Sequence, residues 1–117
     1  MFFLLSCCLV ACIAVKLNAD INNVRVEINS SNLMGQLIPW DCILVGDMFY
    51  DENFASKLFK WLRLVHNSGK LILIGDAGRL ALRNLCEREN LKSLASVQLP
   101  PNVIFENGFS SAEIWSL

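Results

Sequence analysis

The stretch WDCILVGDMFYDENFASKLFKWLRLVHNSGKLILIGDAGR, residues 40–79, decides the fold. It contains two short apolar runs, Cys42 to Val45 and Leu71 to Ile74, and each run leads into a Gly-Asp pair. Short apolar runs bounded by turn residues are typical of buried strands. Between them, apolar side chains recur at helical spacing on one stripe: Phe54, Leu58, Trp61, Leu62 and Val65. The order strand, helix, strand predicts a βαβ unit whose two strands are parallel.

The two Gly-Asp pairs, Gly46-Asp47 and Gly75-Asp76, follow these strands directly. Ligands of parallel sheets bind beyond the carboxyl ends of the strands, so both pairs are expected at the same binding edge. A purely structural role is also open. Asp47 or Asp51 can cap the helix that begins near Asn53, and Asp76 to Arg79 has the composition of a turn.

Two segments of the central stretch, GDMFYDE at 46–52 and LIGDAGR at 73–79, resemble the lysine methyltransferases of the electron transfer flavoprotein β subunit. These are seven-β-strand enzymes that use S-adenosylmethionine. The resemblance runs from about Ala11 to the carboxyl terminus and is most specific in the central stretch. It implies an α/β fold, a partial Rossmann-like class I methyltransferase sheet containing strands three to seven with flanking helices.

The family's strand order, 3-2-1-4-5-7-6, makes residues 24–28 strand three and residues 42–45 strand four. The first two strands, which separate these two in the family, are then lacking from the 117 residues. Strands three and four must pair directly or leave apolar edges open, and open edges favour aggregation or a partner strand. We therefore expect a poorly stable or partner-dependent fold.

The resemblance also implies roles for residues of the methyl-transfer site. Asp47 and Tyr50 are the expected catalytic residues, with Asp47 orienting the lysine nitrogen or accepting its proton. Phe49 and Tyr50 would form an aromatic wall that favours cationic groups. Asp76 and Arg79 are expected to shape the substrate pocket together with Phe49.

For the cofactor, the resemblance implies that Gly46 lies against S-adenosylmethionine and that Asn32 reaches the adenine. Class I enzymes also hold this cofactor with a glycine-rich loop, because only glycine lets the backbone approach so closely. No G-x-G occurs in the sequence. We therefore expect impaired cofactor binding by this chain, as in a truncated enzyme, and a non-catalytic interaction module or membrane-anchored product is the alternative.

Composition limits which ligands and partners the chain is expected to bind. Ten basic and eleven acidic residues nearly balance, and no basic patch indicates nucleic acid. The five cysteines have no zinc-site or Cys-x-x-Cys spacing, so no metal is assigned. The implied protein partner is the electron transfer flavoprotein β subunit, and the implied location is the mitochondrial matrix, although no transit peptide is legible.

The amino terminus is unusual because residues 1–15 carry no charge. The segment lacks the basic region that begins a secretory signal. It is also shorter than the ~20 apolar residues that a membrane span needs. Val10, Ile13, Ala14, Leu17 and Ile21 instead form one stripe of an amphipathic helix. We divide the chain into an unmatched apolar segment, 1–10, and an incomplete methyltransferase domain, 11–117. Membrane association through residues 1–15 stays open.

After the central stretch, the pattern predicts a helix from Leu80 to Glu89 and a strand from Leu94 to Leu99. A terminal hairpin is expected from Val103 to Phe105 and from Ala112 to Trp115, turning at Asn107-Gly108.

Overall fold

The computed structural model describes residues 2–5 and 8–117 as an α/β protein of two compact units, Met1–Leu33 and Met34–Leu117. This division rests on packing, whereas the division proposed after residue 10 rests on family likeness and stays a prediction. Residues 1, 6 and 7 of the unmatched segment lie outside the described part of the chain.

The amino-terminal unit contains β1 (Phe2–Leu5), α1 (Leu9–Ile21) and β2 (Val26–Asn29). The two strands pair in parallel, from Phe2 opposite Val26 to Leu5 opposite Asn29. The predicted helix and the predicted strand are confirmed, whereas β1 was not expected. Four residues of the helix stripe are large and exposed: Val10, Ile13, Leu17 and Ile21. Among the described residues, no helix combines the length and apolar character that crossing a membrane requires.

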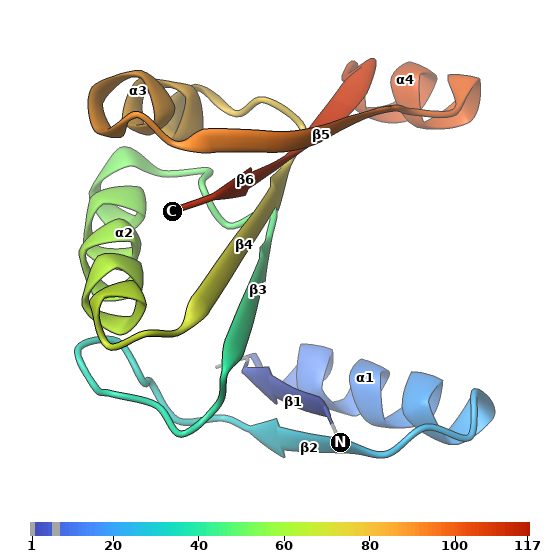
Figure 1. Cartoon of the computed structure of the whole chain (residues 1–117). Helices are drawn as coiled ribbons and strands as arrows, with labels where there is room; N and C mark the ends of the chain where they lie inside the picture. The colour runs from blue at the N-terminus through green and yellow to red at the C-terminus, as the bar shows by residue number, and fades with distance from the viewer. Residues whose placement is uncertain (1, 6–7) are drawn as a thin grey trace. The chain divides into compact units, whose positions relative to one another are not determined.

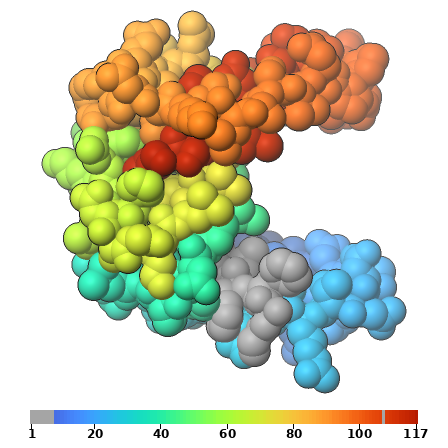
Figure 2. All heavy atoms as spheres, viewed as in Figure 1, coloured from blue at the N-terminus to red at the C-terminus, as the bar shows by residue number. Residues whose placement is uncertain are grey.

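The second unit is built on a four-stranded sheet in the order β3-β4-β6-β5 (Figure 1). β3 and β4 are parallel, and β6 is antiparallel to both β4 and β5. Figure 2 shows atoms of β6 (red) between those of β4 (yellow) and those of β5 (orange). The elements of this unit are β3 (Cys42–Gly46), α2 (Glu52–Asn67), β4 (Leu71–Asp76), α3 (Leu80–Glu89), β5 (Lys92–Gln98), α4 (Pro101–Asn107) and β6 (Ser111–Ser116).

The core lies where α2 and α3 cover one face of this sheet (Figure 1). The predicted apolar stripe of α2 faces inward, and Leu62 and Val65 are fully buried. Ile72 and Ile74 of β4 are buried against this layer. Asp51 begins α2 as its N-cap, because its carboxylate accepts a hydrogen bond of 2.7 Å from the amide of Phe54.

The predicted terminal hairpin is wrong in its first half. Residues 103–105 lie in α4, which starts after Pro100 with Pro101 in its first turn and ends at Gly108 with φ 76°. Proline suits the first helical turn because its amide hydrogen is not needed there, and glycine accepts the left-handed cap. The second half is a strand, β6, but it inserts between β4 and β5.

β3 lies at the edge of the four-stranded sheet, and β2 belongs to the separate two-stranded sheet. Within residues 34–117, no strand pairs with the outer edge of β3. Leu44 on β3 is 73% exposed, whereas its neighbour Val45, on the other face of the sheet, is buried. An apolar edge of this kind invites pairing with another strand.

Candidate functional site

The two Gly-Asp pairs meet at one edge of the sheet, as the βαβ pattern predicted. Gly46 and Gly75 are register partners at the carboxyl ends of β3 and β4. The Asp47 amide donates a hydrogen bond of 3.0 Å to the Gly75 carbonyl. Asp47 has a φ of 50°, in the left-handed region that Asp tolerates better than most residues. Such conformations persist only where surrounding contacts fix them, so Asp47 is held in place.

Arg79 supplies the strongest of these contacts. Its Nε donates to Oδ1 of Asp47 at 2.5 Å, and its Nη2 donates to Oδ2 at 2.8 Å. This bidentate geometry orients the carboxylate as well as pairing its charge. The hydrogen bonds from Arg79 hold the pKa of the Asp47 carboxyl below its ordinary value, although partial burial opposes them. Asp47 is therefore a fixed anion and a weak base.

Asp76 fixes the start of the loop that carries Arg79. It is only 3% exposed, and its Oδ1 accepts hydrogen bonds of 2.7 Å from the amides of both Gly78 and Arg79. The turn expected from the sequence is thus real. Oδ2 of Asp76 is buried and has no hydrogen-bond partner among the described residues. Arg79 therefore contacts both acids: its backbone amide donates to Asp76 and its guanidinium donates to Asp47.

Phe109 completes the surroundings of Arg79. The guanidinium carbon lies 5.9 Å from the centre of the Phe109 ring, a cation–π distance. Phe109 follows Gly108, which ends α4, and it reaches Arg79 only because β6 returns beside β4. The sequence analysis missed Phe109, since nothing in its neighbourhood along the chain marks it.

The two aromatic residues after Asp47 have different surroundings. Phe49 is 0% exposed and belongs to the core, so packing accounts for it and contact with a substrate stays a prediction. Tyr50 is 64% exposed, and its ring stacks on Phe54 at a centroid distance of 5.7 Å. No hydrogen bond joins Tyr50 to Asp47 in the part of the chain that the structure describes, and the catalytic role of Tyr50 likewise stays a prediction.

The residues proposed for the cofactor are only partly brought together. Gly46 lies beside Asp47, and the space that a side chain would take at Gly46 is open, which suits close approach of a ligand. Asn32 is exposed and belongs to the amino-terminal unit, so its role is untested. The 117 residues contain no glycine-rich loop, so they do not fit a whole S-adenosylmethionine site. No cluster of metal-ligating side chains occurs among the described residues.

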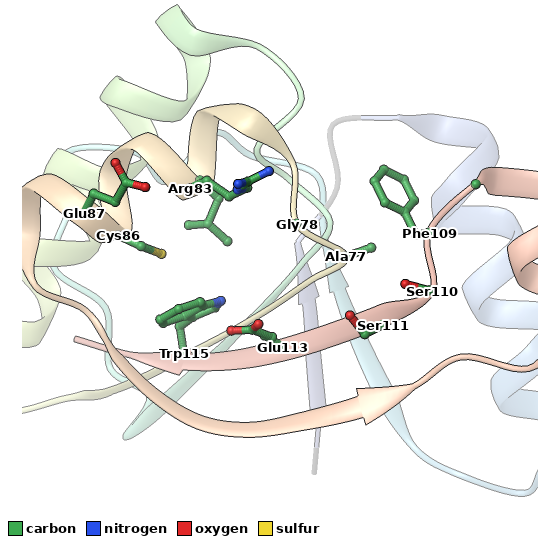
Figure 3. Close-up of a pocket in the computed structure, with 12 residues that line it drawn as sticks. Ala77, Gly78, Arg83, Cys86, Glu87, Phe109, Ser110, Ser111, Glu113 and Trp115 are labelled. Atoms are coloured by element: carbon green, nitrogen blue, oxygen red, sulfur yellow. The ribbon is translucent and has the colours of Figure 1, made fainter.

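A cavity of about 540 Å³ lies beside Gly78, between α3 and β6 (Figure 3). Side chains from both elements and from the loop before β6 line it, and six of them carry its chemistry: Arg83, Cys86, Glu87, Phe109, Glu113 and Trp115. Burial, with Glu113 and Asp76 nearby, raises the pKa of the Cys86 thiol to about 11. Cys86 therefore stays neutral and packs as a small half-buried side chain.

Comparison with curated proteins gives a consistent result. The chain is 41% identical over 110 residues to the electron transfer flavoprotein β subunit lysine methyltransferase of Danio rerio, a match covering 91% of this chain and 43% of the relative. The Xenopus laevis protein of that name is 36% identical over 88% of the chain and 44% of its own length. The Caenorhabditis elegans homologue is 34% identical over 92% of the chain and 54% of its length.

The chain is homologous to part of this methyltransferase family. It spans a little under half the length of the two vertebrate relatives, consistent with the carboxyl-terminal portion that the sequence indicates. No family model and no solved structure matches. The resemblance carried by the Gly-Asp segments is thereby confirmed.

Proposed function

We propose that residues 34–117 form the lysine-binding side of a protein-lysine methyltransferase that uses S-adenosylmethionine. The observation that carries this proposal is Asp47, which Arg79 fixes at the carboxyl edge of two parallel strands. The strand order β3-β4-β6-β5 supports it, because it is the order 4-5-7-6 of a class I methyltransferase sheet, with the last strand antiparallel.

In methyl transfer, a neutral lysine amine attacks the methyl carbon of a sulfonium, and the sulfur leaves with the bonding electrons. The chain's own contribution is positioning, which accounts for much of the acceleration of such displacements. Asp47 is half-exposed and keeps lone pairs beyond the two that Arg79 occupies, so it can accept a hydrogen bond from the lysine nitrogen.

Between the two roles expected for Asp47, the Arg79 contact favours orientation over proton removal. A carboxylate whose pKa lies below its ordinary value takes a proton poorly at neutral pH. A lone carboxylate would also favour the charged form of the lysine, since an opposite charge raises an amine's pKa. Arg79 offsets this effect by sharing the charge of Asp47. The lysine therefore loses its proton to solvent or to another group.

The cofactor's adenosyl and amino-acid parts need residues that the 117 residues do not supply. We expect the isolated chain to bind S-adenosylmethionine weakly or not at all and to show negligible turnover. The relatives' names make the electron transfer flavoprotein β subunit the proposed substrate, and the mitochondrial matrix, where that substrate is expected, is the proposed location.

A segment exchange tests the proposed function. The matched portion of the Danio rerio relative is replaced by this chain, and methylation of the electron transfer flavoprotein β subunit is measured with labelled S-adenosylmethionine. We expect the hybrid to be active, and Asp47→Asn in the hybrid to lower kcat/KM about a hundredfold through misplacement of the amine. Asp47→Asn keeps the shape of the side chain and tolerates the left-handed backbone.

Asp41→Asn is the matched control. Asp41 precedes the same strand at its other end, where its carboxylate pairs with Lys70 at 3.3 Å. The substitution removes the same charge from the opposite edge of the sheet, so methylation should be unchanged. A folded hybrid without activity, or equal losses from the two substitutions, would refute the proposal and favour the non-catalytic interaction module.

A further inference from the structure

We propose that the cavity between α3 and β6 binds a basic side chain, lysine or arginine, of the protein substrate next to the acceptor lysine. This inference rests on the proposed function and deepens it. The cavity of about 540 Å³ has room for a long side chain, and it lies wholly within the Met34–Leu117 unit.

The charges around the cavity favour a cation. Glu87 on α3 and Glu113 on β6 line it (Figure 3), and neither carboxylate is in an ion pair among the described residues. Asp76 lies directly opposite Glu113 in the register of β4 and β6, on the same face of the sheet. Oδ2 of Asp76 is buried without a hydrogen-bond partner in the described chain, and the charge of Asp76 interacts with Arg79. Arg83 is the one cation in the described cavity lining, and Arg79 next to the cavity is already paired with Asp47.

The apolar part of the cavity suits the same ligand. Trp115 and Phe109 supply aromatic surface, which attracts ammonium and guanidinium groups through the ring faces. The methylene stem of lysine or arginine packs against apolar surface while its charged end meets carboxylates. A carboxylate or phosphate ligand would meet two carboxylates, Glu87 and Glu113, against the single cation Arg83, so the lining favours cations over anions.

The position of the cavity connects it to Asp47. Gly78 and Phe109 line the cavity, while Arg79, the residue after Gly78, contacts both Phe109 and Asp47. A substrate whose lysine reaches Asp47 therefore has a neighbouring residue within reach of the cavity. This arrangement predicts a preference for acceptor lysines with a second basic residue close by in the substrate.

Binding is tested on the whole 117-residue chain by NMR, with N-acetyl-lysine amide and N-acetyl-arginine amide as probes. We expect millimolar, salt-sensitive binding that shifts the Trp115 indole and the amides of Ser110 and Ser111. N-acetyl-norleucine amide, which has the apolar stem without the charge, should bind at least about fivefold more weakly, as expected for loss of ion pairing near a protein surface.

Glu113→Gln should weaken binding of the basic probes about fivefold. Glu87→Gln is the second variant, because it lies on an exposed helix position that the fold does not need. Glu106→Gln is the matched control: it removes the same charge from α4, outside the cavity. Equal binding of norleucine and lysine probes, no shift at Trp115, or equal effects of the three substitutions would overturn the inference.

The segment-exchanged enzyme separates this inference from the proposed function. Peptides with and without a basic neighbour of the acceptor lysine are compared, and Glu113→Gln should raise KM for the first peptide alone. An active hybrid with the same KM for both peptides refutes the proposed cation site but not the proposed methyltransferase function. Probe binding by the chain with an inactive hybrid keeps the cavity as a cation site and refutes the methyltransferase.

Discussion

Helices α1 and α2 show the same apolar periodicity but differ in burial. The stripe of α1 is exposed, with Leu17 58% and Ile21 77% accessible, whereas Leu62 and Val65 of α2 are fully buried against the sheet. The two helices also begin differently, since Asp51 caps α2 through its side chain and Cys8 provides no such bond to α1. Periodicity therefore predicts a helix, but a covering surface decides whether that helix stabilises the fold.

The largest expected effect comes from truncating the buried stripe. Leu62→Ala removes a fully buried side chain from α2 and should lower the free energy of unfolding by about 2–5 kcal/mol, because lost transfer energy and a residual cavity add. Leu17→Ala in α1 should change it by less than about 0.5 kcal/mol. Urea titrations followed by circular dichroism measure both. Similar losses for the two variants would mean that the α1 stripe is covered in solution.

Cysteine reactivity gives the second comparison between buried and exposed positions. The pKa of Cys86 is raised to about 11 by burial, and Cys8 and Cys42 are exposed. At pH 9 the Cys86 thiolate is scarce, so alkylation should be about tenfold slower there than at the exposed thiols. Raising the pH toward 11 should bring the alkylation rate of Cys86 closer to the rates of the exposed thiols. Peptide mass spectrometry after timed iodoacetamide treatment measures each rate, and equal rates at pH 9 would contradict the burial of Cys86.

The sequence predicted the parts of the fold that depend on local pattern. The apolar runs around Val45 and Leu73 are strands, and α3 has the predicted bounds, Leu80–Glu89. The sequence prediction was wrong where pairing between segments far apart in the chain decides the structure. Residues 103–105 have strand-like composition, but the prolines before them start a helix, and β6 fills the place beside β4.

The candidate site was predictable to the same extent. Asp47, Asp76 and Arg79 lie at one edge because parallel strands end together, which the sequence pattern indicates. Phe49 is buried in the core after the left-handed turn at Asp47, and the position of Phe109 depends on the path of β6. Neither has a signal in neighbouring residues, so both needed the three-dimensional structure.

The helix caps provide the third comparison. Asp51→Ala removes the carboxylate that accepts the Phe54 amide and should cost about 1 kcal/mol of stability. Cys8→Ala at the start of α1 should cost less, because no side-chain cap bond is lost there. The same urea titrations apply, and hydrogen exchange at the first turn of each helix localises the effect. A larger loss for Cys8→Ala would place an unrecognised stabilising contact at α1.

The smallest expected effect comes from the exposed ion pair of Asp47 and Arg79. Because the pKa of Asp47 is lowered in the folded protein, its contribution is present above the ordinary value of 3.8 and is lost as the pH falls through the folded value. Asp47→Asn should therefore lower the urea midpoint at pH 7 by only about 0.2 M, since exposed pairs contribute little, and this effect should shrink as the pH falls below 3.8. Asp20→Asn in α1 breaks no ion pair in the described chain and removes an acidic charge near the helix C-terminus, so it should not lower the urea midpoint at neutral or acidic pH. If the loss caused by Asp47→Asn does not shrink as the pH falls, contacts that do not depend on the charge of the carboxylate, rather than charge pairing, hold the site together. In that case Arg79 would be free to contact a substrate, and its role as the residue that positions Asp47 would fail.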